Sequence, residues 1–333
     1  MKKITLGFSI LAASAIFMFG CKKEKDTEIE PDMEFQSSVD ISYALQVITD
    51  VDMVCSYSGE NDVDFSRFFR HVPTSVTPSV VTVSRDTVLE MISVSFNNAV
   101  CRDGHKRDGT IAMSFKNANP NAKYYRDFAF AGKVLLINYK VDDWKISAKG
   151  DLIIRNLVAP VNYSPTTTNL NWSITGDFYL KHPTDSSKDM HCYAALTKTL
   201  TNTSNKLVFP PSKQAAINWS IATVEYKGTM YGETSRNVPF KFAIDEARPL
   251  LRDFVCSPDK VYGTVVGTNS VTPRIELYTP FTGGAASFTT STKYPRVIYY
   301  GPEDPSQPPS CDNTGAVMIK GISYPIDFKK VYK

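Results

Sequence analysis

Apolar and polar residues alternate one by one along many short stretches of this chain. A period of two places every apolar side chain on the same face of a β-strand, so each stretch predicts a strand with one buried face. Clusters rich in Asn, Pro, Asp, Ser and Thr, such as residues 117–121, 165–169 and 183–188, predict turns between them. Many short strands with frequent turns predict a mainly β fold, an antiparallel β-sandwich or a barrel-like sheet. The clearest alternations run over residues 92–96, 111–115, 144–148, 170–174, 238–244 and 322–328.

One stretch near the N-terminus has a different period. Its apolar residues recur at steps of three and four, which places them in one stripe along a helix. We therefore predict a single helix over residues 34–58, packed on the sheet, with Ser37 or Ser38 as its N-terminal cap. No long helical pattern follows Ser58. The stripe consists of Ile41, Ala44, Leu45, Ile48, Val51 and Cys55.

The first residues of the chain form a processing signal. Lys2 and Lys3 precede an uncharged stretch, residues 4–20, that ends in Gly20-Cys21. This order resembles the signal peptide and lipobox of bacterial lipoproteins, which implies removal of residues 1–20 and lipidation of Cys21. An ordinary signal peptide with a coincidental cysteine, or a single membrane anchor, are the alternatives.

A lipid on Cys21 anchors a chain in a membrane without a spanning helix. Residues 21–33 are charged and poor in apolar residues, which predicts a flexible tether. We expect an exported outer-membrane lipoprotein, facing either the periplasm or the cell surface. Removing Lys2 and Lys3 with the signal lowers the net charge from +3 to +1. A nearly neutral chain gives no electrostatic reason to expect a nucleic-acid partner.

Five cysteines remain beside Cys21, and an odd number leaves at least one thiol free if all pairs are intramolecular. Disulfides are permitted outside the cytoplasm, and we expect a bridge between Cys256 and Cys311. No Cys-x-x-Cys spacing occurs and the chain has four histidines, so we expect no metal and no cofactor. His191 and Cys192 are neighbours on an expected strand, which points their side chains apart. The five are Cys55, Cys101, Cys192, Cys256 and Cys311.

Two short segments recur along the chain. Asn-Trp-Ser-Ile occurs at residues 171–174 and 218–221, and the segment that begins at Cys101 has a partner that begins at Cys311. A duplicated β unit would explain both, with a first unit over residues 59–160 and a second over residues 161–333. The two units are either separate or one continuous domain. Chance recurrence of good strand and turn residues is the alternative.

The same residues carry a family resemblance. Cys101-x-Asp103-Gly104 is followed by Arg107 and Gly109, then by Asn-Tyr at residues 138–139, and later by Tyr-Gly at residues 300–301. With Cys-Asp-Asn at residues 311–313 and a final hairpin over residues 320–328, this pattern resembles a group of Bacteroidetes exported lipoproteins that have no assigned activity. The resemblance covers most of the mature chain. It implies an exported β-rich lipoprotein, and the insert over residues 302–310 departs from it.

Candidate sites each have a structural explanation. Asp103-Gly104 and residues 312–313 are turn formers, and no Asp-x-Asp-x-Asp-Gly ligand set accompanies them. Arg107 is expected to pair with Asp103 or Asp108, or else to bind a carboxylate ligand. Alternation places the three tryptophans in the core rather than on a sugar-stacking platform. Tyr124 and Tyr125 lie outside a clear strand, so they are the better candidates for exposed ligand-contact rings.

Enzyme motifs are missing from the sequence. It has no Gly-x-Ser-x-Gly, His-Glu-x-x-His, P-loop or dinucleotide-binding motif, and we name no catalytic residue. The leading hypothesis is a cell-envelope lipoprotein with a non-catalytic structural or binding β-domain, whose ligand is a glycan or an envelope protein. A carbohydrate-binding accessory lipoprotein would instead show exposed coplanar aromatic rings in a groove. A hydrolase would show two carboxylates, or a nucleophile and a base, converging in a cleft.

Overall fold

The computed structural model divides the chain into two compact units, Met1–Gln36 and Ser37–Lys333, and the second holds the fold. Of the first unit the structure describes only residues 31–36. In the second, as in the chain as a whole, the description has gaps. The described residues are 31–60, 81–86, 88–101, 105–116, 122–159, 169–201, 217, 219, 222–254, 281–290, 295–308 and 314–328.

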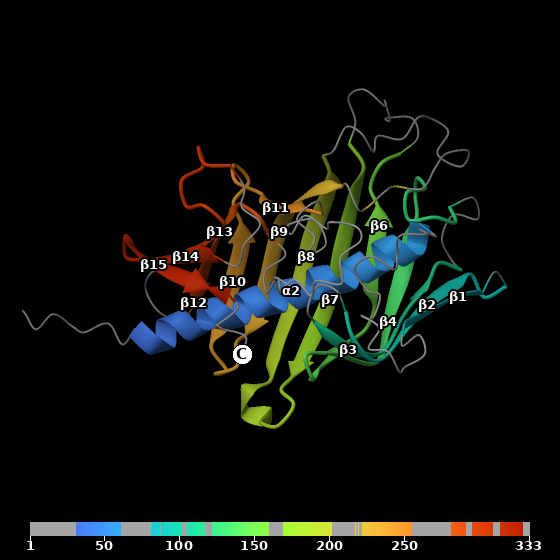
Figure 1. Ribbon diagram of the computed structural model, residues 1–333, viewed down its shortest axis with the longest axis horizontal. Coiled ribbons are helices and arrows are strands. Elements are labelled where there is room, and N and C mark those ends of the chain that lie inside the picture. The colour runs from blue at the N-terminus through green and yellow to red at the C-terminus, as the bar shows by residue number, and fades with distance from the viewer. Residues whose placement is uncertain are drawn as a thin grey trace, which may run out of the picture. The chain divides into compact units, whose positions relative to one another are not determined.

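The second unit is built on one antiparallel sheet, which confirms the mainly β prediction (Figure 1). The strands are β1 (Val81–Asp86), β2 (Met91–Val100), β3 (Lys106–Ser114), β4 (Ala131–Val141), β5 (Trp144–Ala148), β6 (Leu152–Asn156), β7 (Asn171–Lys181), β8 (Met190–Leu200), β9 (Thr223–Glu233), β10 (Pro239–Ile244), β11 (Leu250–Asp253), β12 (Ala285–Thr290), β13 (Arg296–Tyr300), β14 (Thr314–Ile319) and β15 (Ile322–Asp327).

Strands that follow one another in the chain are neighbours in the sheet. The order is β1-β2-β3-β4-β5-β7-β8-β9-β10-β12-β13-β14-β15, with β6 between β4 and β7 and with β11 paired to β9. Strands β5 and β6, which precede residue 160, both pair with β7, which follows it. The sheet is therefore continuous across the boundary expected near residue 160.

The predicted alternation is clearest in the central strands. Along β7 and β8 buried residues alternate with half-buried ones over the full length of each strand. Trp172 and Ile174 point into the core, whereas Asp177 and Tyr179 point out. At the last strand the pattern weakens, because Ile322 of β15 is 53% exposed. An edge strand has a neighbour on one side only, so less of its apolar face is covered.

Among the described residues the one α-helix, α2 (Pro31–Glu60), starts earlier than predicted, and Ser186–Lys188 form a short 3-10 helix, η3. The first residue of α2 is a proline, which suits the first helical turn because that position needs no backbone N–H donor. Ser37 and Ser38 therefore lie inside the helix, and the prediction that one of them caps it is wrong. The prediction of one buried stripe is also too narrow, since every residue from Ser37 to Glu60 is buried.

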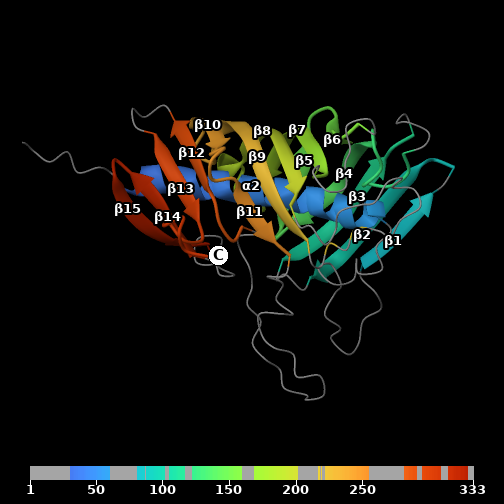
Figure 2. The same cartoon turned by 90° about the horizontal axis from the view of Figure 1, so that it is seen from above.

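Burial on all sides requires the sheet to curve around the helix. Asp50 and Asp52 lie two positions apart, about 200° around an α-helix, so their side chains point in nearly opposite directions. Asp50 is bound by Arg107 of β3, whereas Asp52 is bound by Lys198 of β8. Strands on both sides of the helix must therefore approach it. Figure 2 shows the strands arching around the part of α2 that belongs to this unit.

Three buried cysteines lie among the described residues, namely Cys55, Cys101 and Cys192. Cys55 of α2 and Cys192 of β8 are free and buried. Burial, together with the negative charge of Asp177, raises the pKa of Cys192 to about 12. Burial also raises the pKa of Cys55 far above its usual value, and Asp52 adds to this. At neutral pH both groups are therefore protonated thiols, which are poor nucleophiles.

We expect both thiols to resist alkylation in the folded protein. Iodoacetamide at pH 8 should leave the Cys55 and Cys192 peptides unmodified under native conditions and should modify both in urea, because only unfolding removes the burial that suppresses the thiolate. Peptide mass spectrometry measures the difference. Equal modification of Cys192 with and without urea would contradict the buried position of β8's inner face.

Candidate functional site

Buried polar groups line the interface between α2 and the sheet, and the centre of this interface is the pair of Asp52 and Lys198. Both side chains are 0% exposed, and Lys198 Nζ donates hydrogen bonds to Asp52 Oδ2 (2.7 Å) and Ser56 Oγ (2.6 Å). The hydroxyls of Tyr125 and Tyr226 donate to the same carboxylate at 2.8 and 3.0 Å. Desolvation lowers the pKa of Lys198, although the charge of Asp52 opposes the shift. Both oxygens of the Asp52 carboxylate therefore accept a hydrogen bond.

Aromatic rings enclose the lysine end of this pair. Lys198 Nζ lies 4.6 Å from the ring centroid of Tyr125, 4.8 Å from that of Trp219 and 5.2 Å from that of Trp172. Ring faces attract a cation, and more strongly where water is excluded. Trp172 and Trp219 are fully buried, in agreement with the prediction that they belong to the core. The same prediction is wrong for Trp144, which is half-buried at the start of β5. Trp172 lies on β7, whereas Trp219 precedes β9, so the repeated tryptophans occupy different secondary structure.

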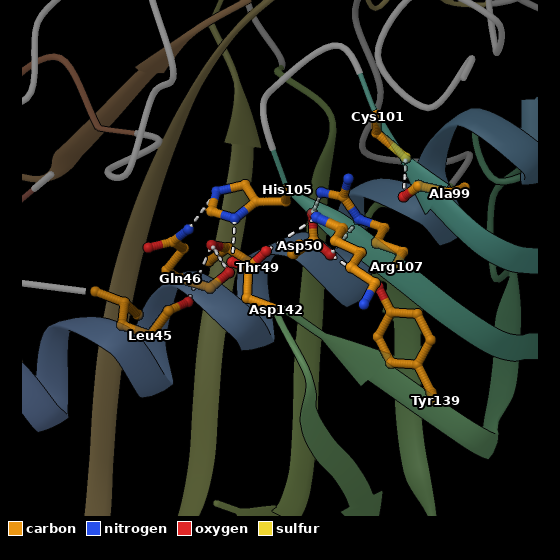
Figure 3. A network of polar contacts seen from close by, with 11 residues as sticks. Leu45, Gln46, Thr49, Asp50, Ala99, Cys101, His105, Arg107, Tyr139 and Asp142 are labelled. Atoms are coloured by element: carbon orange, nitrogen blue, oxygen red, sulfur yellow. Dashed lines mark hydrogen bonds and ion pairs between the residues drawn. The ribbon is translucent and has the colours of Figure 1, made fainter. Parts of the chain in front are cut away.

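Arg107 forms the second buried ion pair. Its Nε and Nη2 donate to Asp50 Oδ2 and Oδ1 at 3.1 and 2.5 Å, and the Tyr139 hydroxyl donates to Oδ2 at 2.9 Å (Figure 3). The predicted pairing with Asp103 or Asp108 is wrong for Asp108, which binds the backbone N–H of Asn98 and lies 3.7 Å from Lys140. The reason is the alternation of β3, which points Arg107 inward and Asp108 outward. Asp103 lies outside the described residues.

The nearest approach to catalytic geometry is a histidine held between two elements. His105 Nδ1 lies 2.6 Å from Asp142 Oδ2, and its Nε2 lies 2.7 Å from the amide nitrogen of Gln46. With that amide as donor, Nε2 accepts and Nδ1–H donates to Asp142. Burial raises the pKa of Asp142, but His105 and the Lys106 N–H outweigh it, so the pKa lies below its usual value. A general base needs Nε2 beside a nucleophile, and here that nitrogen binds Gln46 (Figure 3).

The C-terminal end of α2 is fixed by Glu60. Its carboxylate accepts from Arg126 Nη1 at 2.5 Å, from the Arg126 backbone N–H at 2.6 Å and from the Ile217 N–H at 3.2 Å. Desolvation nevertheless raises the pKa of Glu60 above its usual value, because the loss of water outweighs the attraction of Arg126. This carboxylate stands at the end of the helix and is enclosed by protein groups.

Neither of the two tyrosines that were expected to contact a ligand has a fully exposed ring. The expected exposure of Tyr125 is wrong, because its side chain is 0% exposed and reaches Asp52 in the core. Tyr124 is half-buried, and the guanidinium carbons of Arg126 and Arg85 lie 4.4 and 5.3 Å from its ring centroid. A residue outside a strand is not necessarily at the surface, and this loop packs against the end of α2.

The outer face of the central strands carries rings that the sequence analysis did not single out. Tyr179 of β7 stacks on His191 of β8 at 4.3 Å and 25°, and Tyr193 of β8 stacks on Tyr231 of β9 at 5.0 Å and 29°. His191 also pairs with Asp177. The tyrosines occupy the polar phase of the alternation in three neighbouring strands. The sequence could have indicated these rings, because an aromatic residue at a polar position of the alternation points away from the core.

A groove lies beside Tyr231, which is 52% exposed. The groove has a volume of about 430 Å³, a size common for small-ligand sites. Apart from residues whose side chains point inward, its lining comes from the outer face of β9, β10 and β12. These outward residues are Thr229, Tyr231, Lys241, Ala243, Ser287 and Thr289.

Several predicted sites cannot be placed. Cys21, Cys256 and Cys311 lie outside the described residues, as do Asp103, Gly104 and residues 312–313. No protein-family model, curated protein or solved structure matches the chain. The described helix is too polar to qualify as a membrane span.

Removal of one partner from the ion pair of Asp52 and Lys198 should strongly destabilise the folded protein. We expect Asp52→Ala to lower the free energy of unfolding by about 3–5 kcal/mol, because it leaves Lys198 buried without its counter-charge. Replacing the lysine as well, in Asp52→Ala with Lys198→Met, should recover part of the loss. Urea denaturation monitored by tryptophan fluorescence measures all variants.

The matched control for this experiment is an exposed pair. Asp151 and Lys133 are about half exposed, so Asp151→Ala should cost less than about 1 kcal/mol. Similar losses for Asp52→Ala and Asp151→Ala would show that the buried pair does not hold the helix in place.

The pair of His105 and Asp142 should respond to acid. A carboxylate whose folded pKa is depressed stabilises the protein above its unfolded pKa, and this stability is lost as the pH falls through the folded value. We therefore expect the stability difference between wild type and Asp142→Asn to shrink as the pH is lowered below the ordinary value of 3.8. Urea unfolding at a series of pH values from 7 to 3 measures it. Asp143→Asn, at an exposed neighbour, is the control, and a difference that stays constant with pH would rule out this linkage.

Proposed function

We propose that this chain is an exported lipoprotein, anchored by a lipid on Cys21, whose β-domain is a non-catalytic binding module of the cell envelope. The observation that carries the proposal is that the inner face of the sheet holds buried ion pairs, whereas the outer face points away from the core and bears a groove. On the inner face, Asp50, Asp52 and Glu60 are each bound by a cation of the sheet or its loops. On the outer face, Tyr231 borders a groove that is open to a ligand.

The inner face offers little to a substrate. Catalytic acids, bases and nucleophiles must reach the reacting atoms, and their unusual pKa values have to serve that contact. Here Lys198 has a shifted pKa but is 0% exposed and bound to Asp52. His105 has the partner of a catalytic histidine but binds Gln46 through its second nitrogen. Both arrangements favour a role in holding α2, and they give the hydrolase hypothesis no support.

The export part of the proposal rests on the N-terminal sequence. Lys2 and Lys3, the uncharged residues 4–20 and the Gly20-Cys21 step have the order of a lipoprotein signal. The charged residues 21–33 would separate the lipid from the β-domain. A domain held in this way can meet ligands near the membrane without spanning it.

A carbohydrate-binding role is the second candidate, and one observation favours it. The expected mark was exposed, coplanar aromatic rings in a groove. Tyr231 borders the groove on the outer face as one exposed ring, whereas Tyr193 stacks against it instead of lying beside it in the same plane. An envelope-protein ligand would be recognised instead by a broader surface around the groove.

Lipidation at Cys21 can be tested directly. Cells grown with an alkyne-labelled palmitate should yield a labelled protein. Cys21→Ser should abolish the label and leave the precursor uncut, because the lipid is attached to the lipobox cysteine and a serine hydroxyl cannot form the thioether. Gel fluorescence and immunoblotting report label and size. Cys192→Ser, which changes a buried thiol, should keep both. A labelled Cys21→Ser protein would contradict the anchor.

The side of the membrane follows from protease treatment of intact cells. Digestion of the protein would put the domain at the cell surface, and survival until the outer membrane is broken would put it in the periplasm. The labelled Cys192→Ser protein should behave as wild type in this assay.

A further inference from the structure

The groove beside Tyr231 is built from two cross-strand rows on the outer face. In the first row Tyr231 of β9 lies opposite Lys241 of β10, which lies opposite Thr289 of β12. The second row lies beside the first and has only small side chains, so few side-chain atoms cover the backbone of the sheet there. This shortage of side-chain volume opens the groove of about 430 Å³. The second row consists of Thr229, Ala243 and Ser287.

The ring of Tyr231 forms one wall. Its partner in the stack, Tyr193, belongs to β8, whereas the other strands that line the groove, β10 and β12, lie on the opposite side of β9. One ring face is therefore supported by Tyr193, and the other is turned toward the groove. A ring that is already supported loses little conformational freedom when a ligand packs against it.

Most of the groove's exposed lining is apolar, and its polar groups besides Tyr231 are three hydroxyls and one ammonium. Thr229, Ser287 and Thr289 each bring a hydroxyl that can donate and accept, and Lys241 brings an ammonium that donates. A pyranose has an apolar face of C–H groups and a rim of hydroxyls. The aromatic wall matches the first and the hydroxyl groups match the second.

Other ligand classes match this groove less well. A peptide that adds as a strand needs an open sheet edge, but β9, β10 and β12 each pair with strands on both sides. A phosphate or sulfate group would be recognised by several cations, and among the lining residues Lys241 is the one cation. A hydrophobic partner would leave the three hydroxyls unpaired in its interface.

We infer that this groove is a carbohydrate-binding site, in which one pyranose of a polysaccharide stacks on Tyr231 while its hydroxyls bond to Thr229, Ser287, Thr289 and Lys241. The inference rests on the proposed binding function and names its ligand class. It requires no movement of the inner core, because all of these side chains lie on the outer face of paired strands.

The test is affinity electrophoresis of the detergent-solubilised full-length protein. Native gels containing a soluble β-glucan, α-glucan, mannan or xylan should retard the wild type in at least one case. Tyr231→Ala should weaken that binding at least about tenfold, or about 1.4 kcal/mol, because it removes the ring on which the sugar stacks. Tyr231→Phe, which keeps the ring, should retain most of the affinity. Ala243→Trp should abolish it by filling the floor of the groove.

The matched control is Tyr324→Ala, which removes a half-buried tyrosine from β15 at the far end of the strand order. It should bind as wild type does. Thermal melts must show that the Tyr231 and Ala243 variants remain folded, as the outward position of both residues predicts. Retardation of wild type and Tyr231→Ala to the same extent would overturn the site. Absence of retardation by all four polysaccharides would overturn the ligand class, whereas failure of palmitate labelling would overturn the lipoprotein anchor independently.

Discussion

The ion pair between Asp52 and Lys198 is the contact on which the arrangement of this domain depends. Both groups are fully buried, and each has further partners in the tyrosine hydroxyls, Ser56 and the surrounding rings. Two charges taken out of water cost several kcal/mol each, and only close, fully hydrogen-bonded geometry offsets that cost. Few alternative packings of α2 could supply such geometry. The pair therefore favours the position of the helix in which Asp52 meets Lys198 of β8 and Tyr226 of β9.

The other polar residues of α2 extend the same constraint around the helix. Asp50 pairs with Arg107 of β3, on the side of the helix nearly opposite to Asp52. A flat sheet could not satisfy both, so the charges on α2 and the curvature of the sheet require each other. Serine and threonine side chains of the helix bond instead to backbone carbonyls of the preceding turn. Thr49, for example, donates to the Leu45 carbonyl at 3.0 Å. With its charged groups engaged in this way, the inner face holds the fold together, and the outer face is the one free to meet a ligand.

Particular residues show how far prediction from the sequence could reach. The strands around Val94, Ile174 and Phe242 were predicted because alternation depends on the local backbone alone. The partner of Arg107 was not, because Asp50 is 57 positions away and nothing in the sequence near Arg107 indicates it. Tyr125 was expected at the surface because it lies outside a strand, yet its loop packs under α2. The groove was not predicted, because its two rows consist of residues from β9, β10 and β12. Which of these residues lie opposite one another is set by strand pairing in the folded protein.

The sequence by itself determined the mainly β class, the single N-terminal helix and the inward positions of Trp172 and Ile174, since these follow from residue periodicity and local propensity. The proposal of a lipoprotein signal also rests on the sequence alone, because the Gly20-Cys21 step is a linear motif that depends on no fold. The tertiary structure decided which charges meet, that residues 37–60 of α2 are buried on all sides, and that Tyr231 stands beside a row of small residues. Those facts depend on distances between segments far apart in the chain, and such distances exist only once the sheet has curved around the helix.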